Sequence, residues 1–311
     1  MAILVDYRSV ASASMMKGFG MGSLNGANNE ALVKSSNEIL LGKLRYYNSE
    51  FRDEFGELVL CTDANSWRYK IFPHYKGQRK LARINGMDQN PDDPMHAIYD
   101  SIHKFWEIIC ETGPYKCLRI NGAEGDDLLA AIAMTPGKHL CISADKDISQ
   151  LTRFPNVKYY NSLKKQMVNN GPNFWHQLVV RGDGGDGIPN ILSDDDTFMV
   201  KDKRQRQLRQ DVVDKIVDSV DPEETILSMK FSGIFSEQVV LNYRRNKRLI
   251  DLTQIPKSLR ELVVQKFNSS EPPKRDLVAM LVALKNPQYI GRLSDFVPKR
   301  ETIDSSSIDI F

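Results

Sequence analysis

The chain has 311 residues, of which 41% are hydrophobic and 26% are charged, a composition typical of a globular protein with enough apolar side chains for a core. Wholesale disorder is excluded, and the length allows either one large domain or two of ordinary size. The 42 basic and 40 acidic residues nearly balance, so the net charge of +2 names no partner. No apolar run approaches the ~18 residues of a membrane span, and the apolar start Met1–Val5 is too short for a signal peptide. We therefore expect a cytoplasmic protein that does not contact a membrane.

Four short apolar segments, each followed at once by acidic or turn residues, predict buried β-strands. They are Ala2–Val5, Leu58–Thr62, Lys116–Ile120 and His139–Ser143. Amphipathic stretches at Asn29–Tyr47 and Met95–Glu111 predict helices between them. The segment Ala11–Asn29, rich in Gly, Ser and Met, predicts a mobile loop. The alternation favours an α/β fold with a central, mostly parallel sheet flanked by helices.

Beyond about residue 180 the strand pattern fades and the apolar spacing becomes helical. The expected helices are Asp211–Val220, Ser236–Arg248 and Leu259–Phe267. The sequence therefore predicts an α/β core over residues 1–180, a helical domain over 181–303 and a flexible tail over 304–311.

Acidic residues follow each predicted strand. Because the carboxyl ends of parallel strands meet at one edge of a sheet, we expect these acids to converge in a single crevice. A further acidic pair lies in the Gly-rich segment RGDGGDGIPN, where the backbone permits close approach. The acids in question are Asp6, Asp63, Glu124, Asp126, Asp127, Asp145, Asp147, Asp183 and Asp186.

Taken one at a time, such acids are ordinary turn formers and helix N-caps. As a crowded set they would repel one another unless cations neutralised them. Oxygen ligation without His or Cys favours Mg²⁺ or Mn²⁺ over zinc, and two such ions ~3.5–4 Å apart clamp the attacking and leaving oxygens of a phosphodiester. Calcium storage is an alternative, but the chain lacks an EF-hand loop, and it also lacks the GxSxG and GxxxxGK[ST] motifs. The acids therefore favour two-metal hydrolysis.

Basic and aromatic residues alternate in WRYKIFPHYKGQRKLAR, directly after the second predicted strand. This pattern suits single-stranded nucleic acid, since cations follow phosphates while rings stack on bases; a solvated helix with aromatic residues in the core is the alternative. Two further basic runs, KDKRQRQLR and RRNKR, fit a duplex backbone. The candidate nucleic-acid contacts are Arg68, Lys70, Tyr75, Lys80, Arg83, Lys201, Lys203, Arg204, Arg206, Arg209, Arg244, Arg245, Lys247 and Arg248.

The ordered set LVD, D…WRYKIFPHYKGQR, EGDDLLAAIA, ISADKDISQL and GDGGDGIPNI resembles the 5′-nuclease family, which includes flap endonucleases and the exonuclease domain of bacterial DNA polymerase I. The stretch LNYRRNKRLIDLTQIP and the chain length are most similar to the ribonuclease H branch of T-even bacteriophages. The resemblance implies a metal-dependent, PIN-like nuclease core joined to a helical duplex-binding domain. It also implies 5′→3′ removal of RNA primers and DNA flaps during lagging-strand synthesis, in the host's cytoplasm if a phage encodes the protein.

The resemblance further implies roles for individual residues, with two Mg²⁺ ions as the cofactor and Mn²⁺ as a possible substitute. The first ion would be surrounded by Asp6, Asp63, Glu124, Asp126, Asp127 and Asp145, and the second by Asp147, Asp183 and Asp186. Lys76 matches the basic residue that engages the scissile phosphate, with Arg79 beside it, so both are candidate catalytic residues. Gly125 stands where many relatives carry Ala. The family's usual glycine-rich second hairpin is replaced by LSDDDTFMVKDKRQRQL, which puts monovalent-ion binding there in doubt.

Two other functions stay open: a PIN-like endoribonuclease that acts on structured RNA, and a DNA-binding protein with an inactive nuclease core. The partners implied are branched or nicked DNA and RNA·DNA duplex, with a sliding clamp and a single-strand DNA-binding protein as further candidates, and we expect a monomer. The tail ends in apolar residues that suit a clamp pocket, a frayed terminus being the alternative. These residues are Ile308, Ile310 and Phe311. The polar segment Ile84–Pro94 predicts either a mobile arch over a 5′ single strand or a surface linker.

Overall fold

The computed structural model describes residues 1–19, 29–85, 94–270 and 276–297, without the side chains of residues 82–85 and 94. In this part of the chain, one six-stranded sheet has the order β3-β2-β1-β4-β5-β6, parallel throughout except for the antiparallel edge strand β6. The strands are β1 (Ala2–Asp6), β2 (Glu57–Cys61), β3 (Lys116–Leu118), β4 (His139–Ser143), β5 (Val157–Asn161) and β6 (Gln166–Met167). The predicted mostly parallel sheet is confirmed.

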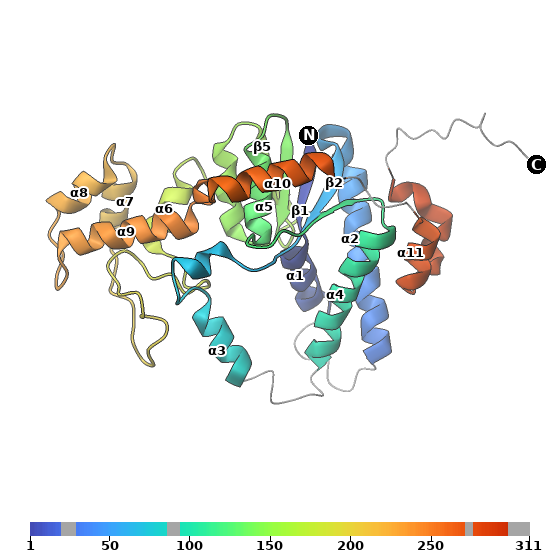
Figure 1. Cartoon of the computed structure of the whole chain (residues 1–311), viewed down its shortest axis with the longest axis horizontal. Helices are drawn as coiled ribbons and strands as arrows, with labels where there is room; N and C mark the ends of the chain where they lie inside the picture. The colour runs from blue at the N-terminus through green and yellow to red at the C-terminus, as the bar shows by residue number, and fades with distance from the viewer. Residues whose placement is uncertain (20–28, 86–93, 271–275, 298–311) are drawn as a thin grey trace, which may run out of the picture.

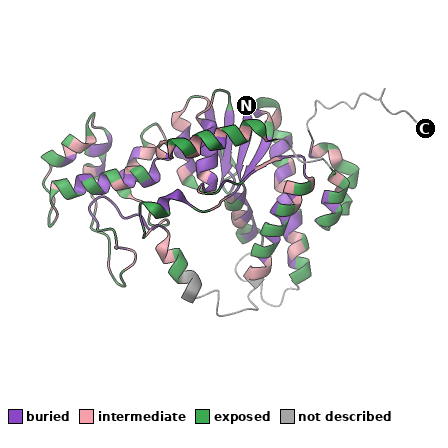
Figure 2. Cartoon of the chain, viewed as in Figure 1, coloured by how far each residue is buried: buried purple, intermediate pink, exposed green. Residues whose placement is uncertain are grey.

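Helices cover both faces of this sheet, so its central strands are buried on both sides (Figures 1 and 2). Successive side chains of β1 point to opposite faces: Ile3 and Val5 join one apolar cluster, Ala2 and Leu4 the other. The first cluster includes residues of α1 (Tyr7–Phe19), α2 (Asn29–Phe55), α4 (Pro94–Thr112) and α11 (Leu277–Ala283). The second includes residues of α5 (Gly125–Ala133) and α10 (Lys257–Ser269).

A third apolar cluster builds the helical end of the molecule, opposite α11 (Figure 1). It is formed mainly by α6 (Phe174–Arg181), α7 (Gln210–Val217), α8 (Pro222–Ser228) and α9 (Ser236–Ile250). The helices expected after residue 180 are present. However, α10 and α11 pack on the sheet faces and not in this cluster, and the domain boundaries at 180 and 303 stay a prediction.

Shorter elements connect these layers. They are the 3₁₀ helices η1 (Trp67–Lys70), η3 (Lys146–Arg153), η4 (Leu252–Gln254) and η5 (Pro287–Asp295), and the helix α3 (Gly77–Asn85). No helix among the described residues has the length and hydropathy needed to cross a membrane.

Two predictions of local structure need correction. The loop predicted over Ala11–Asn29 is wrong for residues 11–19, which belong to α1, because its small residues let Ala11, Ser14 and Met15 pack in the interior. Residues 20–28 lie outside the described part. Of the segment predicted as an arch, residues 86–93 also lie outside it, and the flanking residues close α3 and open α4. The strands β5 and β6 were not predicted.

Candidate active site

Two acids from neighbouring strands meet at the carboxyl edge of the sheet. Asp6 ends β1, where its carboxylate accepts hydrogen bonds from Ser143 Oγ at 2.8 Å and the Ser9 backbone amide at 3.2 Å. Asp63 follows β2 and accepts a bond from the amide of Gly125 at 2.7 Å. A Cβ atom on Gly125 would lie 3.2 Å from an oxygen of each acid. The start of α5 thus lies directly against both carboxylates.

Three more acids surround the N-terminus of α5, where the helix dipole favours negative charge. Glu124 is the N-cap, and its backbone amide donates to Asp127 Oδ2 at 3.0 Å in a reciprocal capping box. Oxygen atoms of Glu124, Asp126 and Asp127 lie within 4.8 Å of one another, a spacing that fits a metal ion.

Glu124 is buried but fully provided with partners. Its Oε2 accepts hydrogen bonds from Ser66 Oγ at 2.8 Å, Tyr75 Oη at 2.7 Å and Arg68 Nη1 at 3.0 Å, and its Oε1 pairs with Lys76 Nζ. Burial raises the pKa of this carboxyl, but Lys76 and Arg68 outweigh burial and lower the pKa to about 2. Glu124 is therefore ionised and neutralised by protein cations.

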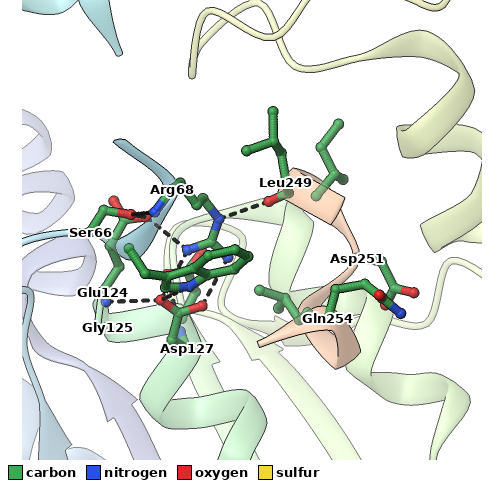
Figure 3. A network of polar contacts seen from close by, with 12 residues as sticks. Ser66, Arg68, Glu124, Gly125, Asp127, Leu249, Asp251 and Gln254 are labelled. Atoms are coloured by element: carbon green, nitrogen blue, oxygen red, sulfur yellow. Dashed lines mark hydrogen bonds and ion pairs between the residues drawn. The ribbon is translucent and has the colours of Figure 1, made fainter. Parts of the chain in front are cut away.

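Asp127 is 0% exposed, and both of its oxygens are occupied. Arg68 forms a bidentate pair with this carboxylate, with Nη2 2.8 Å from Oδ1 and Nη1 2.9 Å from Oδ2. Trp67 Nε1 also donates to Oδ2, at 3.2 Å. Arg68 itself is only 2% exposed, and Figure 3 shows it enclosed by these acids. The two residues form a buried ion pair at the base of the acidic cluster.

A basic segment faces the same cluster from the turn before α3. Lys76 lies 3.6 Å from Asp186 Oδ2, Arg79 lies 3.0 Å from Asp186 Oδ1, and Tyr75 Oη lies 2.8 Å from Oδ2. The Lys76 amide also donates to the backbone oxygen of Asp186 at 2.8 Å. Burial lowers the pKa of Lys76, but Asp186 and Glu124 raise it overall above its ordinary value. Lys76 is therefore held as a cation between two acids.

The remaining acids have fewer partners. Asp145 caps η3 through the amide of Asp147, at 2.9 Å, and its side chain is exposed. Asp147 Oδ1 is buried with no hydrogen-bond partner among the described residues. Burial and the charges of Asp145 and Asp183 raise the pKa of Asp147 to about 7. Burial and Asp186 raise the pKa of Asp183 as well.

One narrow cleft is lined by four of these nine acids. Its lining includes Asp126, Asp147, Asp183 and Asp186, together with Tyr75. Burial raises the pKa of Asp126 well above its ordinary range, against the opposing charge of Arg68. A buried, unpartnered carboxylate oxygen and several raised carboxyl pKa values fit a site for hard divalent cations, because an ion would relieve both.

Two predicted nucleic-acid contacts need correction. Arg68 and Tyr75 are 2% and 1% exposed, and their polar atoms are bound to carboxylates and, for Arg68, a backbone carbonyl, so neither presents a polar group to a nucleic acid in this structure. Other basic candidates are exposed on the surface: Lys70, Lys80, Lys201, Arg204, Arg206, Arg209, Arg244 and Arg248.

The other predicted contacts are less accessible or not described. Lys203, Arg245 and Lys247 are half-buried, and the first two pair with acids of the segment after Ser193. The side chain of Arg83 lies outside the described residues, as do the tail residues Ile308, Ile310 and Phe311.

Several residues that build the site were not predicted. Ser143, Ser66 and Ser9 hold acids in place through hydroxyl or amide groups, and only Ser143 carried a signal, as the last residue of a strand before an acidic turn. A cavity of about 410 Å³ borders Asp63 on the side of α4. It is also lined by Arg8, His96, Tyr99, Trp106 and Arg119.

Comparisons with known proteins agree with this architecture. Residues 28–177 match the family model of the 5′-3′ exonuclease N-terminal, resolvase-like domain, and residues 176–296 match the model of the C-terminal domain of T4 RNase H. Ribonuclease H of Enterobacteria phage T4 is 25% identical over 256 residues, which is 78% of this chain and 80% of that protein. Flap endonuclease Xni of Shewanella sp. (strain ANA-3) is 26% identical over 148 residues, 43% of this chain and 51% of that one.

Two solved structures share the fold. The T5 5′-exonuclease with bound divalent metal ions (zinc) has a TM-score of 0.60 at 14% identity, covering 86% of this chain and 98% of that chain. The bacteriophage T5 flap endonuclease in a pseudo-enzyme–product complex with DNA and metal ions has a TM-score of 0.57 at 12% identity, covering 91% and 99%. The two family models together match residues 28–296, and the chain belongs to the 5′-nuclease family of 5′→3′ exonucleases and flap endonucleases.

Proposed function

We propose that the protein is a magnesium-dependent 5′→3′ exonuclease and flap endonuclease that hydrolyses phosphodiesters at the 5′ ends of DNA and RNA·DNA duplexes. The observation that carries the proposal is the convergence of carboxylates whose charge the protein leaves uncompensated, above all the unpartnered Oδ1 of Asp147. Removal of primers in lagging-strand replication is the biological role that this activity suits.

The residues proposed to hold two Mg²⁺ ions are those whose oxygens face the shared edge and cleft. They are Asp6, Asp63, Glu124, Asp126 and Asp145 for one ion, and Asp147, Asp183 and Asp186 for the other. When bound, such ions clamp the attacking and leaving oxygens of a phosphodiester, and Mn²⁺ is expected to substitute. Asp127 is proposed to support this set without binding an ion, because it is fully buried and Arg68 binds both of its oxygens. Glu124 stays in the set because its Oε1 is paired with Lys76 alone.

Lys76 and Arg79 are proposed to act on the scissile phosphate. Both are cations beside Asp186 at the mouth of the acidic cleft, and Lys76 is kept charged by its neighbours. A fixed cation gains most where negative charge builds up on phosphate oxygens in the transition state. Both residues therefore stabilise that charge without moving a proton.

The protein is proposed to bind its substrate as a monomer. The duplex is proposed to lie across both the α/β core and the helical region that follows it. Exposed basic residues of the 201–209 segment and of α9 contact the duplex backbone, while residues 1–180 supply the chemistry. A sliding clamp and a single-strand DNA-binding protein are proposed partners, with the tail at 304–311 as the clamp contact. A cytoplasmic location is expected, which is that of the bacterial host if a phage encodes the protein.

The decisive experiment is end-resolved digestion of a 5′ flap, a nicked duplex and an RNA-primed duplex, with and without Mg²⁺. The proposal expects short 5′ products that require Mg²⁺. A preference for single-stranded RNA over every branched duplex end would favour the PIN-like endoribonuclease. Absence of cleavage with retained duplex binding would favour an inactive DNA-binding protein.

The clamp contact has its own test. Deleting residues 304–311 is expected to leave cleavage of naked flap DNA at the wild-type rate and to remove stimulation by the cognate clamp. Equal stimulation of the truncated and intact proteins would exclude the tail as the clamp contact.

A further inference from the structure

One buried arginine connects the helical end of the molecule to the acidic cluster. Arg68 donates from Nε to the backbone oxygen of Leu249 at 2.7 Å, and from its two terminal nitrogens to Asp127 and Glu124 (Figure 3). Its guanidinium group is therefore bound on one side by α9 and on the other by the start of α5. With 2% exposure it is buried in the wall of the acidic cleft, and its nitrogens are occupied by protein acceptors.

The hydrogen bond from Arg68 pairs with a backbone carbonyl at the C-terminus of α9 that has no partner within the helix. The last carbonyl groups of a helix have no intrahelical partner, and the dipole favours a cation there. Leu249 is one residue before the last residue of α9. Arg68 supplies both a hydrogen-bond donor and a positive charge at the Leu249 carbonyl. A side chain that belongs to the acidic site thus helps to hold the α9 terminus, together with Gln150, which donates to the backbone oxygen of Ile250.

The same helix carries much of the surface proposed to meet the duplex. Arg244 and Arg248 are exposed on α9, and the guanidinium of Arg248 lies 5.1 Å from the ring centroid of Trp67. Arg68 lies 4.8 Å from the centroid of that ring, and the indole of Trp67 donates to Asp127. The helix α9 and the buried Asp127 are therefore joined by two routes: from the Leu249 carbonyl through Arg68, and from the exposed Arg248 through Trp67.

We propose that Arg68 is a positioning residue that couples the docking of α9 on a duplex to the alignment of Glu124 and Asp126 at the start of α5; this rests on the proposed function. The planar guanidinium fixes three acceptors in one relative arrangement, which a lysine at the same place cannot reproduce. A displacement of the α9 terminus moves Asp127, and Asp127 moves the first turn of α5 through the capping box. Arg68 touches neither the substrate nor the reacting atoms.

The test compares Arg68→Lys with the matched control Arg153→Lys. Arg153 also joins the core to the end of α9, through an ion pair with the α9 cap residue Asp251, but it touches none of the acids proposed to hold ions. For Arg68→Lys the proposal expects a flap affinity in EDTA within about threefold of wild type and a single-turnover rate lower by roughly 10–100-fold, because small displacements at a reacting centre cost this much. In steady state, kcat falls and KM stays. Arg153→Lys should stay within about threefold in both.

A second readout does not depend on turnover. If docking and acid alignment are coupled, bound duplex raises the affinity for divalent ions, and the effect is reciprocal. Calorimetric titration with Mg²⁺, with and without a noncleavable flap, should give a rise of about fivefold or more in the wild type and in Arg153→Lys, and little or none in Arg68→Lys. If the wild type cleaves nothing, the proposed function fails while this measurement still tests the coupling.

Several results would overturn the proposal. Equal rate losses in the two variants would indicate general destabilisation, and a rate loss matched by an equal affinity loss would make Arg68 a simple binding residue. If Arg68→Lys does not fold, Trp67→Phe serves instead, because it keeps a ring beside both arginines and removes only the donor to Asp127. A rate lowered several-fold at unchanged affinity then supports the coupling, and an unchanged rate contradicts it.

Discussion

Glu124 and Asp6 are equally buried, at 5% and 7% exposure, yet their carboxyl groups differ sharply in charge balance. Glu124 contacts Arg68 and Lys76, and its pKa falls to about 2. For Asp6, burial and the negative charge of Asp63 raise the pKa to about 7. Asp147 also has a pKa raised to about 7, and its Oδ1 has no hydrogen-bond partner in the part of the chain that the structure describes.

The difference separates two tasks within one cluster. The carboxylates of Glu124 and Asp127 are neutralised by the protein, so their positions are set before any ligand arrives. The carboxylates of Asp6 and Asp147 carry repulsion that either a proton or a bound cation must relieve. Asp186 lies between the two groups, since Lys76 and Arg79 contact it while it adjoins the cleft. Substitutions in the two groups should therefore have opposite effects on stability.

The largest effect is expected from Asp147→Asn. Losing one uncompensated carboxylate should lower the single-turnover rate by roughly 100-fold or more, within the range known for removal of one electrostatic contributor, while duplex affinity in EDTA is unchanged. In the absence of divalent ions the melting temperature should not fall, because the change removes buried repulsion. Glu124→Gln should lower it, because Lys76 and Arg68 lose a charged partner.

The control for both variants is Glu54→Gln, which removes a surface carboxylate paired with Lys158 far from the cluster. It should match the wild type in rate and stability. A melting temperature that falls as much in Asp147→Asn as in Glu124→Gln would contradict the division into two groups.

A smaller loss is expected from Lys76→Ala. Removing the cation beside the scissile phosphate should lower the single-turnover rate by roughly 10–100-fold and leave flap affinity nearly unchanged, because its charge matters most in the transition state. The comparison variant is Lys80→Ala on the exposed surface of α3, which should weaken affinity slightly and leave the rate alone. An unchanged rate in Lys76→Ala would reduce Lys76 to a structural partner of Glu124.

The two groups also predict how stability depends on pH. The folded protein holds protons on Asp6 and Asp147 up to about pH 7, whereas the unfolded chain releases them near pH 4, so in EDTA stability should fall as pH rises between these values. Glu124 contributes stability above its ordinary pKa of 4.5, and this is lost as pH falls toward 2. Thermal melting with and without Mg²⁺ checks this: stabilisation by the ion should be a few degrees larger near pH 8 than near pH 5. An ion effect independent of pH would rule out titration of these two acids as its source.

The predictable parts of this site are those that a short stretch of sequence determines by itself. The strand ending at Asp6 follows from an apolar run that stops at an acid, and β1 and β4 match the prediction within one residue. The burial of Arg68 and Tyr75 was not predictable, because it depends on α9, which is distant in the chain and bonds Arg68 through a backbone oxygen. The strand β5 was missed because the exposed Lys158 interrupts its apolar run.

The smallest effect is expected at Gly125, in the first turn of α5. In Gly125→Ala the new Cβ would lie 3.2 Å from oxygens of both Asp6 and Asp63, so the two side chains must move by a few tenths of an ångström. Ala also favours the helix relative to Gly by up to about 1 kcal/mol, which offsets the crowding. We expect a melting temperature close to that of the wild type and a rate lowered by about threefold at most, because Asp6 and Asp63 lie at the same distance from the new atom and can shift together. The matched control is Gly184→Ala, whose Cβ would meet only the Phe198 ring, at 3.5 Å and as an ordinary contact, and it should leave the rate unchanged. A loss of cleavage rate in Gly125→Ala as large as that in Asp147→Asn would show that Asp6 and Asp63 are held as rigidly as Glu124. The two groups of acids would then differ in charge balance but not in how firmly they are positioned.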